Sequence, residues 1–265
     1  MKKEITAKLI SVLALFMIVF SAYGQATKDI SIRGTFKGLS ISENFKVSYE
    51  QNTSTPSATL FGPEDLLEHV VYSIDKEGVL SFSFDKNFKI AENRVWNISV
   101  ILNGPALDFY SAQANGKISI LTPSTHKNLQ VNVSSSGEIK FSQPITITGN
   151  LNITCSSDGN LDFERTTNCP GDVEILLSSA GSVIFNSLTA GNVIGNISSA
   201  SVLTINDLKA ENVNIESYSA SNVVIKGITD KGEFNAMSAS TIDIKNLKIN
   251  TEPILNSNSA SNIIM

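Results

Sequence analysis

The 265-residue chain carries 20 basic and 25 acidic side chains. Without residues 1–24 its formal charge becomes −7, from 17 basic and 24 acidic residues. An acidic body without basic runs argues against nucleic acid or an anionic membrane as a partner. The remaining length of about 240 residues is one that elongated all-β folds often reach as a single domain.

Residues 1–24 have the pattern of a secretory signal peptide. Lys2 and Lys3 give a charged start, residues 9–20 form an apolar run, and Ala22-Tyr23-Gly24 supplies small residues before Gln25. The apolar run is shorter than the roughly 20 residues of a membrane span, so cleavage is favoured over an uncleaved anchor. We therefore expect an exported protein of the periplasm, the outer-membrane surface or the extracellular space.

Residues 28–107 are rich in strands but show no regular repeat. Their alternating apolar residues predict strands at 30–33, 38–42, 45–49, 58–61, 79–84 and 95–102. One short helix is predicted over residues 64–72, because Pro63 suits a first turn and Leu66, Leu67 and Val70 share one face. The pattern leaves open whether these strands continue or cap the part that follows.

A repeat of small-residue triplets dominates residues 108–265. The eight triplets recur every 19–22 residues: Ala114-Asn115-Gly116, Ser135-Ser136-Gly137, Ser157-Asp158-Gly159, Ser179-Ala180-Gly181, Ser199-Ala200-Ser201, Ser219-Ala220-Ser221, Ser238-Ala239-Ser240 and Ser259-Ala260-Ser261. A unit of this length with short strands and no helix cannot bury its own apolar face, so successive units must stack.

Apolar residues keep fixed positions relative to each triplet. Counting from its middle residue, position +3 is always aliphatic, position +5 is Ile, Phe or Met, and the residues between them are mostly polar, which is the alternation of half-buried strands. A third inward position is predicted at +8, as in Leu188, Leu208, Ile228 and Leu247. The +3 series is Ile118, Ile139, Leu161, Val183, Leu203, Val223, Ile242 and Ile263, and the +5 series is Ile120, Phe141, Phe163, Phe185, Ile205, Ile225, Ile244 and Met265.

These patterns predict an all-β fold, a right-handed parallel β-helix of about eight regular coils preceded by less regular N-terminal strands. Like positions should stack about 4.8 Å apart. The triplets should form tight corners where backbones approach closely. Their serines, from Ser135 to Ser259, are expected to line one edge and to hydrogen-bond at the turns.

The N-terminal half resembles a known family. The order Gly34-x-Phe36-x-Gly38-Leu39-x-Ile41, Phe45-x-Val47, Gly62-Pro63-Glu64-Asp65-Leu66-Leu67, Gly78-Val79-Leu80 and Pro105-x-Leu107, followed by small-residue turns, is similar to that of the head GIN domain family of Bacteroidetes. The resemblance covers residues 29–265 and implies one exported β-helix domain over residues 25–265. It also implies an adhesin role and brings no catalytic or binding residues with it.

Six charged residues are candidates for a polysaccharide-cleaving site, because β-helices host lyases and hydrolases that need clustered carboxylates. The candidates do not share a ladder position, and Asp162 at +4 should lie between Lys140 and Ile184. We therefore expect solvated charges, no catalytic, cofactor or metal site, and no enzyme. The candidates are Asp158, Asp162, Glu164, Arg165, Asp172 and Glu174.

The remaining reactive side chains predict structural roles. His69 is expected on the polar side of the short helix and His126 in a coil loop. Cys155 should point inward and Cys169 should lie in a corner loop, and two cysteines leave a disulfide between them open.

Exposed aromatic side chains could bind sugars by stacking against their rings. The phenylalanines at +5 are expected to be core, whereas Tyr110 and Tyr218 are expected to face outward, and Trp96 is expected in an N-terminal strand. A glycan site near these three is a weaker hypothesis.

The sequence therefore predicts a non-catalytic envelope or surface protein that acts as an adhesin or structural module. The alternative is a glycan-binding or polysaccharide-cleaving β-helix protein. Cell-surface glycans and envelope proteins are the expected classes of partner. The given sequence stops at Met265, just after position +5 of the last coil, so we also expect a homo-oligomer through an uncapped C-terminal coil.

Overall fold

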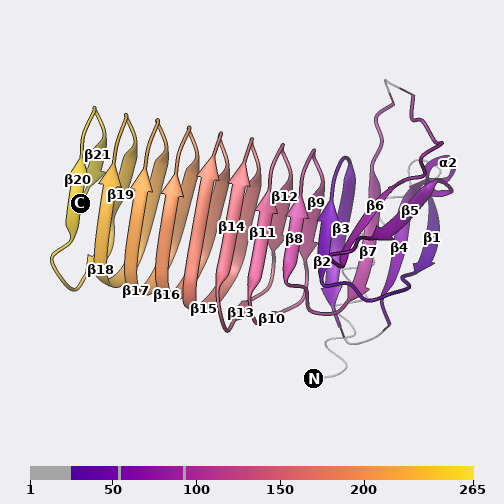
Figure 1. The fold of residues 1–265 in the computed structure, drawn as a ribbon, viewed down its shortest axis with the longest axis horizontal. Coiled ribbons are helices and arrows are strands. Elements are labelled where there is room, and N and C mark those ends of the chain that lie inside the picture. The colour runs from indigo at the N-terminus through magenta and orange to yellow at the C-terminus, as the bar shows by residue number, and fades with distance from the viewer. Residues whose placement is uncertain (1–24, 53–54, 92–93) are drawn as a thin grey trace.

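The computed structural model describes residues 25–52, 55–91 and 94–265. The predicted signal peptide, residues 1–24, lies outside this range. The described residues are 65% strand and 2% helix and wind into a β-solenoid, which confirms the predicted parallel β-helix, with about seven turns where about eight regular coils were predicted. Figure 1 shows the turns stacked along one axis, with β20 and β21 at one end and the irregular N-terminal strands at the other.

Strands in the regular part pair in parallel with the same run of the next turn. The early turns use short strands, β8 (Phe109–Ala112), β9 (Lys117–Ile120), β10 (Ser124–His126), β11 (Leu129–Val133), β12 (Glu138–Phe141), β13 (Ile145–Ile147) and β14 (Leu151–Ser156). The later turns use longer strands that bend round the coil, β15 (Asn160–Ser178), β16 (Ser182–Ile197), β17 (Val202–Ser217), β18 (Asn222–Ala236) and β19 (Thr241–Ile249), followed by β20 (Ile254–Ser257) and β21 (Asn262–Ile264).

The predicted inward ladders form the core. At position +3 Val183 pairs with Leu203, and at position +5 Phe185 pairs with Ile205. Every residue of the two series from Ile118 to Ile244 is buried. Burial of stacked aliphatic and aromatic side chains is the main stabilising contribution in such a rod, because no single turn has a core of its own.

The third inward position is confirmed in Leu188, Leu208 and Leu247, which are buried. It is wrong for Ile228, which is only partly buried. A register shift after Ile205 places Gly227 opposite Leu208 and moves Ile228 one position along. The coil that contains Ile228 spans only 19 residues between triplets, so it is one residue too short to keep the register.

The triplets are tight turns, as predicted, and two physical constraints explain their small residues. Their first two residues adopt left-handed backbone conformations, as in Ser179 (φ 51°) and Ala180 (φ 63°). Their third residue lies against the previous turn, where a Cβ on Gly181 would come within 2.4 Å of the Cys155 carbonyl oxygen. Small residues are therefore needed at the third position, and short side chains are tolerated at the first two.

Hydrogen bonding at the turns differs from the prediction. The first serines of the triplets are exposed, and it is their carbonyl groups that link the turns, as where the Ala180 N–H donates to Ser199 O at 2.9 Å. The bonded hydroxyls belong to the third residues of the later triplets. Ser240 Oγ, for example, donates to Ser217 O at 2.7 Å.

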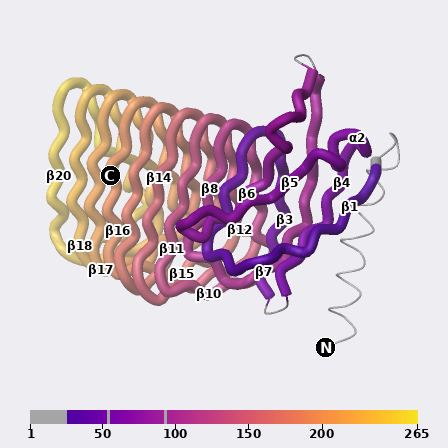
Figure 2. The backbone as a smooth tube through the Cα atoms, turned by 45° about the vertical axis from the view of Figure 1, so that its right-hand side comes forward, coloured from indigo at the N-terminus to yellow at the C-terminus, as the bar shows by residue number. Residues whose placement is uncertain are grey.

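The N-terminal residues both continue and cap the solenoid. Their elements are β1 (Gln25–Ser31), β2 (Gly38–Ile41), β3 (Phe45–Gln51), β4 (Ser57–Pro63), α2 (Glu64–Leu67), β5 (Val70–Ile74), β6 (Val79–Phe84) and β7 (Ile98–Gly104). β2 and β3 pair in parallel with β8 and β9 and so form a further coil. Beyond β7, β4 and then β1 add as antiparallel strands, and Figure 2 shows them at the end of the rod opposite β20.

The predicted helix is shorter than expected. α2 ends at Leu67, and residues from Val70 onward form β5, which pairs with β6. Lys28 Nζ donates to Leu67 O at 2.9 Å, so a side chain from β1 satisfies a carbonyl at the helix end. Among the described residues, no helix is long and apolar enough to cross a membrane.

Candidate functional site

One outward face of the solenoid continues from the N-terminal strands to the last coil. It is formed by β6, β2, β8, β11 and β14, by the C-terminal halves of β15 to β18, and by β20, and we call it the front face. Its first row contains Val79, Gly38, Phe109, Gln130, Asn152, Glu174, Ile194, Asn214, Glu233 and Ile254. Its second row contains Ser81, Ser40, Ser111, Asn132, Thr154, Leu176, Asn196, Glu216, Asn235 and Asn256.

The front face presents similar chemistry from strand to strand. Amide and hydroxyl groups predominate, with a few carboxylates and no Lys or Arg in either row. Because neighbouring strands lie about 4.8 Å apart, these groups recur at that interval along the rod. A regular, rigid row of hydrogen-bonding groups suits an extended ligand better than a compact one.

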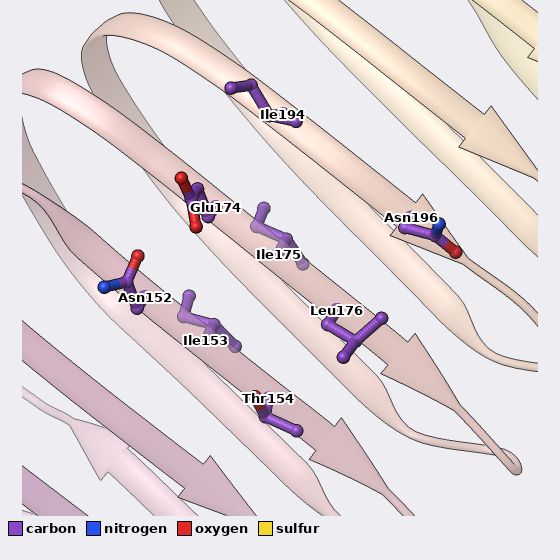
Figure 3. A pocket seen from close by; sticks show the side chains of 8 residues that line it. All are labelled: Asn152, Ile153, Thr154, Glu174, Ile175, Leu176, Ile194 and Asn196. Atoms are coloured by element: carbon purple, nitrogen blue, oxygen red, sulfur yellow. The ribbon is translucent and has the colours of Figure 1, made fainter.

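Two shallow hollows interrupt this polar surface. The first has a volume of about 300 Å³ and lies across β14, β15 and β16. Figure 3 shows Leu176 and Ile194 on adjacent strands of this hollow, with Asn152, Thr154, Glu174 and Asn196 around them. Leu176 is 49% exposed and Ile194 is 45% exposed, so the hollow has an apolar floor within reach of water.

The second hollow, of about 390 Å³, lies nearer the N-terminal end and we call it the Phe109 hollow. Phe109 and Val79 come from the two strands that flank β2, and Gly38 lies between them. A Cβ on Gly38 would meet both side chains at 3.1 Å, so this glycine allows them to close over the backbone of β2. The remaining lining residues, all exposed, are Lys37, Glu77, Asp108 and Gln130.

The acidic candidates are spread over different parts of the coil. Asp162 pairs with Lys140 and Ile184, as predicted. Burial, and then the charge of Glu164, raise the pKa of Asp162. Glu164 and Arg165 are exposed beyond it, and Asp158 is exposed in a triplet turn.

The other two acidic candidates lie further along β15. Asp172 accepts a hydrogen bond from Asn192 Nδ2 at 2.6 Å, within a ladder of corner side chains. Asn212 Nδ2 continues that ladder by donating to Asn192 Oδ1 at 2.7 Å. Glu174 alone lies on the front face, where it lines the hollow of Figure 3. Within the described ranges, no group of three or more His, Cys, Asp or Glu side chains is placed to hold a metal ion.

Both histidines have structural partners, in places that differ from those predicted. His69 follows α2 instead of lying on it; its Nδ1 is 2.9 Å from Asp85 Oδ2, and its ring stacks on Phe88. His126 is buried in β10 rather than in a loop. Successive side chains of a strand point alternately to the core and to solvent, and His126 occupies an inward position in β10.

Both cysteines are free and buried. The inward position of Cys155 is confirmed, but Cys169 lies inside β15 and not in a corner loop. Cys155 Sγ donates to Gly159 O at 3.1 Å, and Cys169 Sγ donates to Gly149 O at 3.2 Å. The two thiols belong to different runs of the coil, so the structure contains no bond between them.

Two of the three weighed aromatic residues are core residues. Tyr110 is fully buried, and Trp96 packs edge-on against Phe45 and Phe84. Only Tyr218 is partly exposed, and its hydroxyl donates to Glu216. Phe109 is the aromatic residue in the two rows of the front face, and the sequence pattern was not used to predict it there. In later coils the inward residues before a triplet lie at positions −5 and −3, and the same register places Tyr110 inside and Phe109 outside.

Comparisons with known proteins agree with this architecture. Residues 35–206 match the family described as "Putative auto-transporter adhesin, head GIN domain". No curated protein matches the sequence. The fold is similar to that of a "putative adhesin" from Parabacteroides merdae, with 18% identity and a TM-score of 0.73 over 90% of this chain and 95% of that chain.

Two further crystal structures share the fold. One is a "putative adhesin" from Bacteroides fragilis, with 16% identity and a TM-score of 0.58 over 91% of this chain and 97% of that one. The other is described as a "Putative lipid binding protein" from Parabacteroides distasonis, with 15% identity and a TM-score of 0.59 over 92% of this chain and 98% of that one. At these identities the likeness concerns the fold alone.

Proposed function

The chain belongs to the family described as "Putative auto-transporter adhesin, head GIN domain", and we propose on this basis that it is an exported, non-catalytic adhesin of the cell envelope or cell surface. The pattern of residues 1–24 supports export. The adhesin description of the family supports binding over catalysis. Cell-surface glycans or envelope proteins are the proposed partners.

The front face is the observation that carries the proposal. Its two rows are held in register from β6 to β20 by continuous parallel pairing, so the surface is rigid before any ligand arrives. A preorganised surface loses little conformational entropy on binding. Both hollows lie on this face. Along the pairing order β8, β11, β14 and β15, three strand spacings of about 4.8 Å separate them, which is about 14 Å.

An extended surface polymer is the ligand shape that this face fits best. A polymer lying along the rod would meet an amide or hydroxyl group at every strand except β15, which offers Glu174 and Leu176, and an apolar floor at each hollow. Individual contacts on a shallow face are weak, but several that act together give useful avidity. The glycan-binding form of adhesion is favoured here by one specific feature, the outward ring of Phe109.

The proposal is tested by a glycan array and a polysaccharide-cleavage screen of purified residues 25–265, with and without calcium. Binding without cleavage is the expected result. Product formation would overturn the non-catalytic role and direct attention to Asp162 and Glu164. Absence of both binding and cleavage would count against glycan adhesion.

A matched pair of variants locates the binding surface. Asn196→Arg places a long charged side chain at the centre of the front face. Asn206→Arg makes the same substitution at a position on β17 that is also exposed but lies outside the front face. We expect array binding to be lost in the first variant and kept in the second, and equal effects would argue against the front face.

A further inference from the structure

We propose that the Phe109 hollow binds one neutral pyranose ring of a surface glycan, with the sugar stacked on the ring of Phe109. The inference rests on the proposed adhesin function and names the ligand class of one part of the front face. It does not depend on the hollow of Figure 3, which lies on other strands.

Gly38 leaves the floor of the hollow without a β2 side chain. With no side chain on β2 at this point, the ring of Phe109 leans over the backbone of β2 towards Val79. Phe109 is only partly buried, so part of its ring still faces solvent. A half-exposed ring above a sheet is a platform for the C–H face of a sugar, since it offers apolar area and a negative π-face to weakly positive hydrogens.

The rim of the hollow is held in place by backbone hydrogen bonds that run across the strands. Lys37 N–H donates to Gly78 O at 2.9 Å, Asp108 N–H donates to Lys37 O at 2.8 Å, and Gln130 N–H donates to Asp108 O at 2.9 Å. The side chains that project from this row therefore start from fixed positions. Fixed positions favour a ligand with several hydroxyl groups at defined spacings.

The rim offers both donors and acceptors that are free to bind a ligand. In the described part of the chain, the side chains of Lys37, Asp108 and Gln130 have no hydrogen-bond or ion-pair partner. The ammonium group donates hydrogen bonds, the carboxylate accepts them and the amide does both, so together the three can serve sugar hydroxyls. An apolar floor with a few convergent polar groups is the general composition of a small-ligand site.

Charge selects among sugars. The carboxylates of Glu77 and Asp108 are matched by the ammonium groups of Lys37 and of Lys76, whose Nζ lies 3.3 Å from Glu77 Oε1, so the surroundings of the hollow are close to neutral. Neither row of the front face contributes a further cation. A uronic acid, sialic acid or sulfated sugar would gain no net attraction from this balanced rim and would meet the formal charge of −7 on residues 25–265, whereas a neutral hexose would not be repelled.

The experiment measures binding of defined oligosaccharides to residues 25–265 by calorimetry and by saturation-transfer NMR. The neutral probes are cellohexaose, laminarihexaose, maltohexaose and mannohexaose, and hexagalacturonate is the anionic probe. We expect at least one neutral probe to bind with saturation transferred to its ring C–H protons, and hexagalacturonate to bind more weakly. Failure of all four neutral probes, or stronger binding of hexagalacturonate, would overturn the proposal.

Variants test the residues. Phe109→Ala should weaken binding by roughly tenfold, which corresponds to about 1.4 kcal/mol, and Phe109→Trp should keep it. Gln130→Ala removes an exposed rim amide without touching the floor, so it keeps the test valid if Phe109→Ala folds poorly, and it should weaken binding by roughly threefold. Unchanged affinity in both Phe109→Ala and Gln130→Ala would overturn the subsite.

The same variants separate this inference from the proposed function. If the wild-type chain binds glycans on the array and Phe109→Ala binds them equally well, the subsite is wrong and the adhesin role stands. Array binding that is lost in both Phe109→Ala and Asn196→Arg supports both proposals. No array binding by the wild-type chain would contradict glycan adhesion itself.

Discussion

The rings of Phe163 and Phe185 lie parallel in adjacent coils, with their centroids 4.4 Å apart and their planes 2° from parallel. Phe141 continues the stack on the other side of Phe163, at 4.8 Å and 8°. These separations are close to the spacing of neighbouring strands, so the repeat itself brings the rings into contact. Phe163 is the central ring and contacts a neighbour on each face.

The stack predicts a specific cost for Phe163→Leu. Each aromatic pair contributes about 0.5–1.5 kcal/mol beyond the area it buries. Phe234 is also fully buried, but in the described residues it has no ring partner, so Phe234→Leu is the matched control. We expect Phe163→Leu to lower the free energy of unfolding in urea by roughly 1–3 kcal/mol more than Phe234→Leu does. Equal losses would show that the stacking adds nothing to burial.

The left-handed triplet residues predict a stabilising substitution. Ala180 has a φ of 63°, a conformation that costs a non-glycine residue roughly 1–2 kcal/mol. Ala180→Gly removes this cost but adds conformational entropy to the unfolded chain, so we expect a net gain of about 0.5–1 kcal/mol in thermal unfolding experiments. The control is Ala106→Gly, at an exposed position whose φ is not positive, which should lower stability. A loss of stability in both variants would contradict the role given to the turn.

The sequence predicts the regular coils well because two independent signals coincide there. The alternation that buries Val183 and Phe185 and the triplets that turn the chain fix the same register in every unit. That register also contains the information that Tyr110 is buried and Phe109 is outward. The repeat does not predict the Phe109 hollow, because the hollow depends on Gly38 and Val79, which come from strands outside the repeat.

Two further features could not be predicted from the local sequence pattern, because they depend on pairing between strands that are distant in the sequence. The stretch after Leu67 has apolar spacing compatible with a helix, but pairing with β6 makes it a strand. A one-residue shortening of the coil moved Ile228 out of the core ladder, although its neighbours obey the pattern. In both cases tertiary pairing overrides local preference.

The thiols should be unreactive in the folded protein. Burial raises the pKa of Cys155 to about 11 and also raises the pKa of Cys169. Only the thiolate reacts quickly with disulfide reagents, so both cysteines should resist Ellman's reagent at about pH 8. After unfolding in guanidinium, two thiols per chain should react, in agreement with two free cysteines. No reaction after unfolding would reveal a disulfide.

In a purified polypeptide of residues 25–265, the exposed edges of β20 and β21 predict self-association. In the described structure β20 pairs with β18 and β21 pairs with β19, each on one side only. Ile254 is 57% exposed and Met265 is 69% exposed at this end. Exposed strand edges with apolar side chains favour pairing with a second chain.

Light scattering over a range of concentrations tests this prediction. We expect a mass above that of the monomer at high concentration, and we expect Ile254→Lys to reduce it. Ile194→Lys is the control, because Ile194 is comparably exposed but lies in the middle of the rod. A strictly monomeric wild-type chain at high concentration would rule out association through this end.

His126 predicts how stability depends on pH. Its Nδ1 lies 2.7 Å from Leu107 O and donates to it, while its Nε2 lies 2.8 Å from Ser124 Oγ and accepts from it. Burial lowers the pKa of His126, against smaller opposing effects of the bond to Leu107 and of the charge of Asp108. The neutral imidazole is therefore the form that the folded state favours.

The sign of the effect follows from comparing the two states. In the unfolded chain His126 gains a proton near pH 6.5, whereas in the folded chain it does so only at lower pH. The unfolded state thus binds more protons as the pH falls below about 6.5, so the free energy of unfolding should decrease in that range. His126→Gln should flatten this slope between about pH 7.5 and pH 5.5, and Ser124→Ala, which keeps the imidazole, should preserve it. Parallel slopes in urea titrations of wild type and His126→Gln would show that another group is responsible.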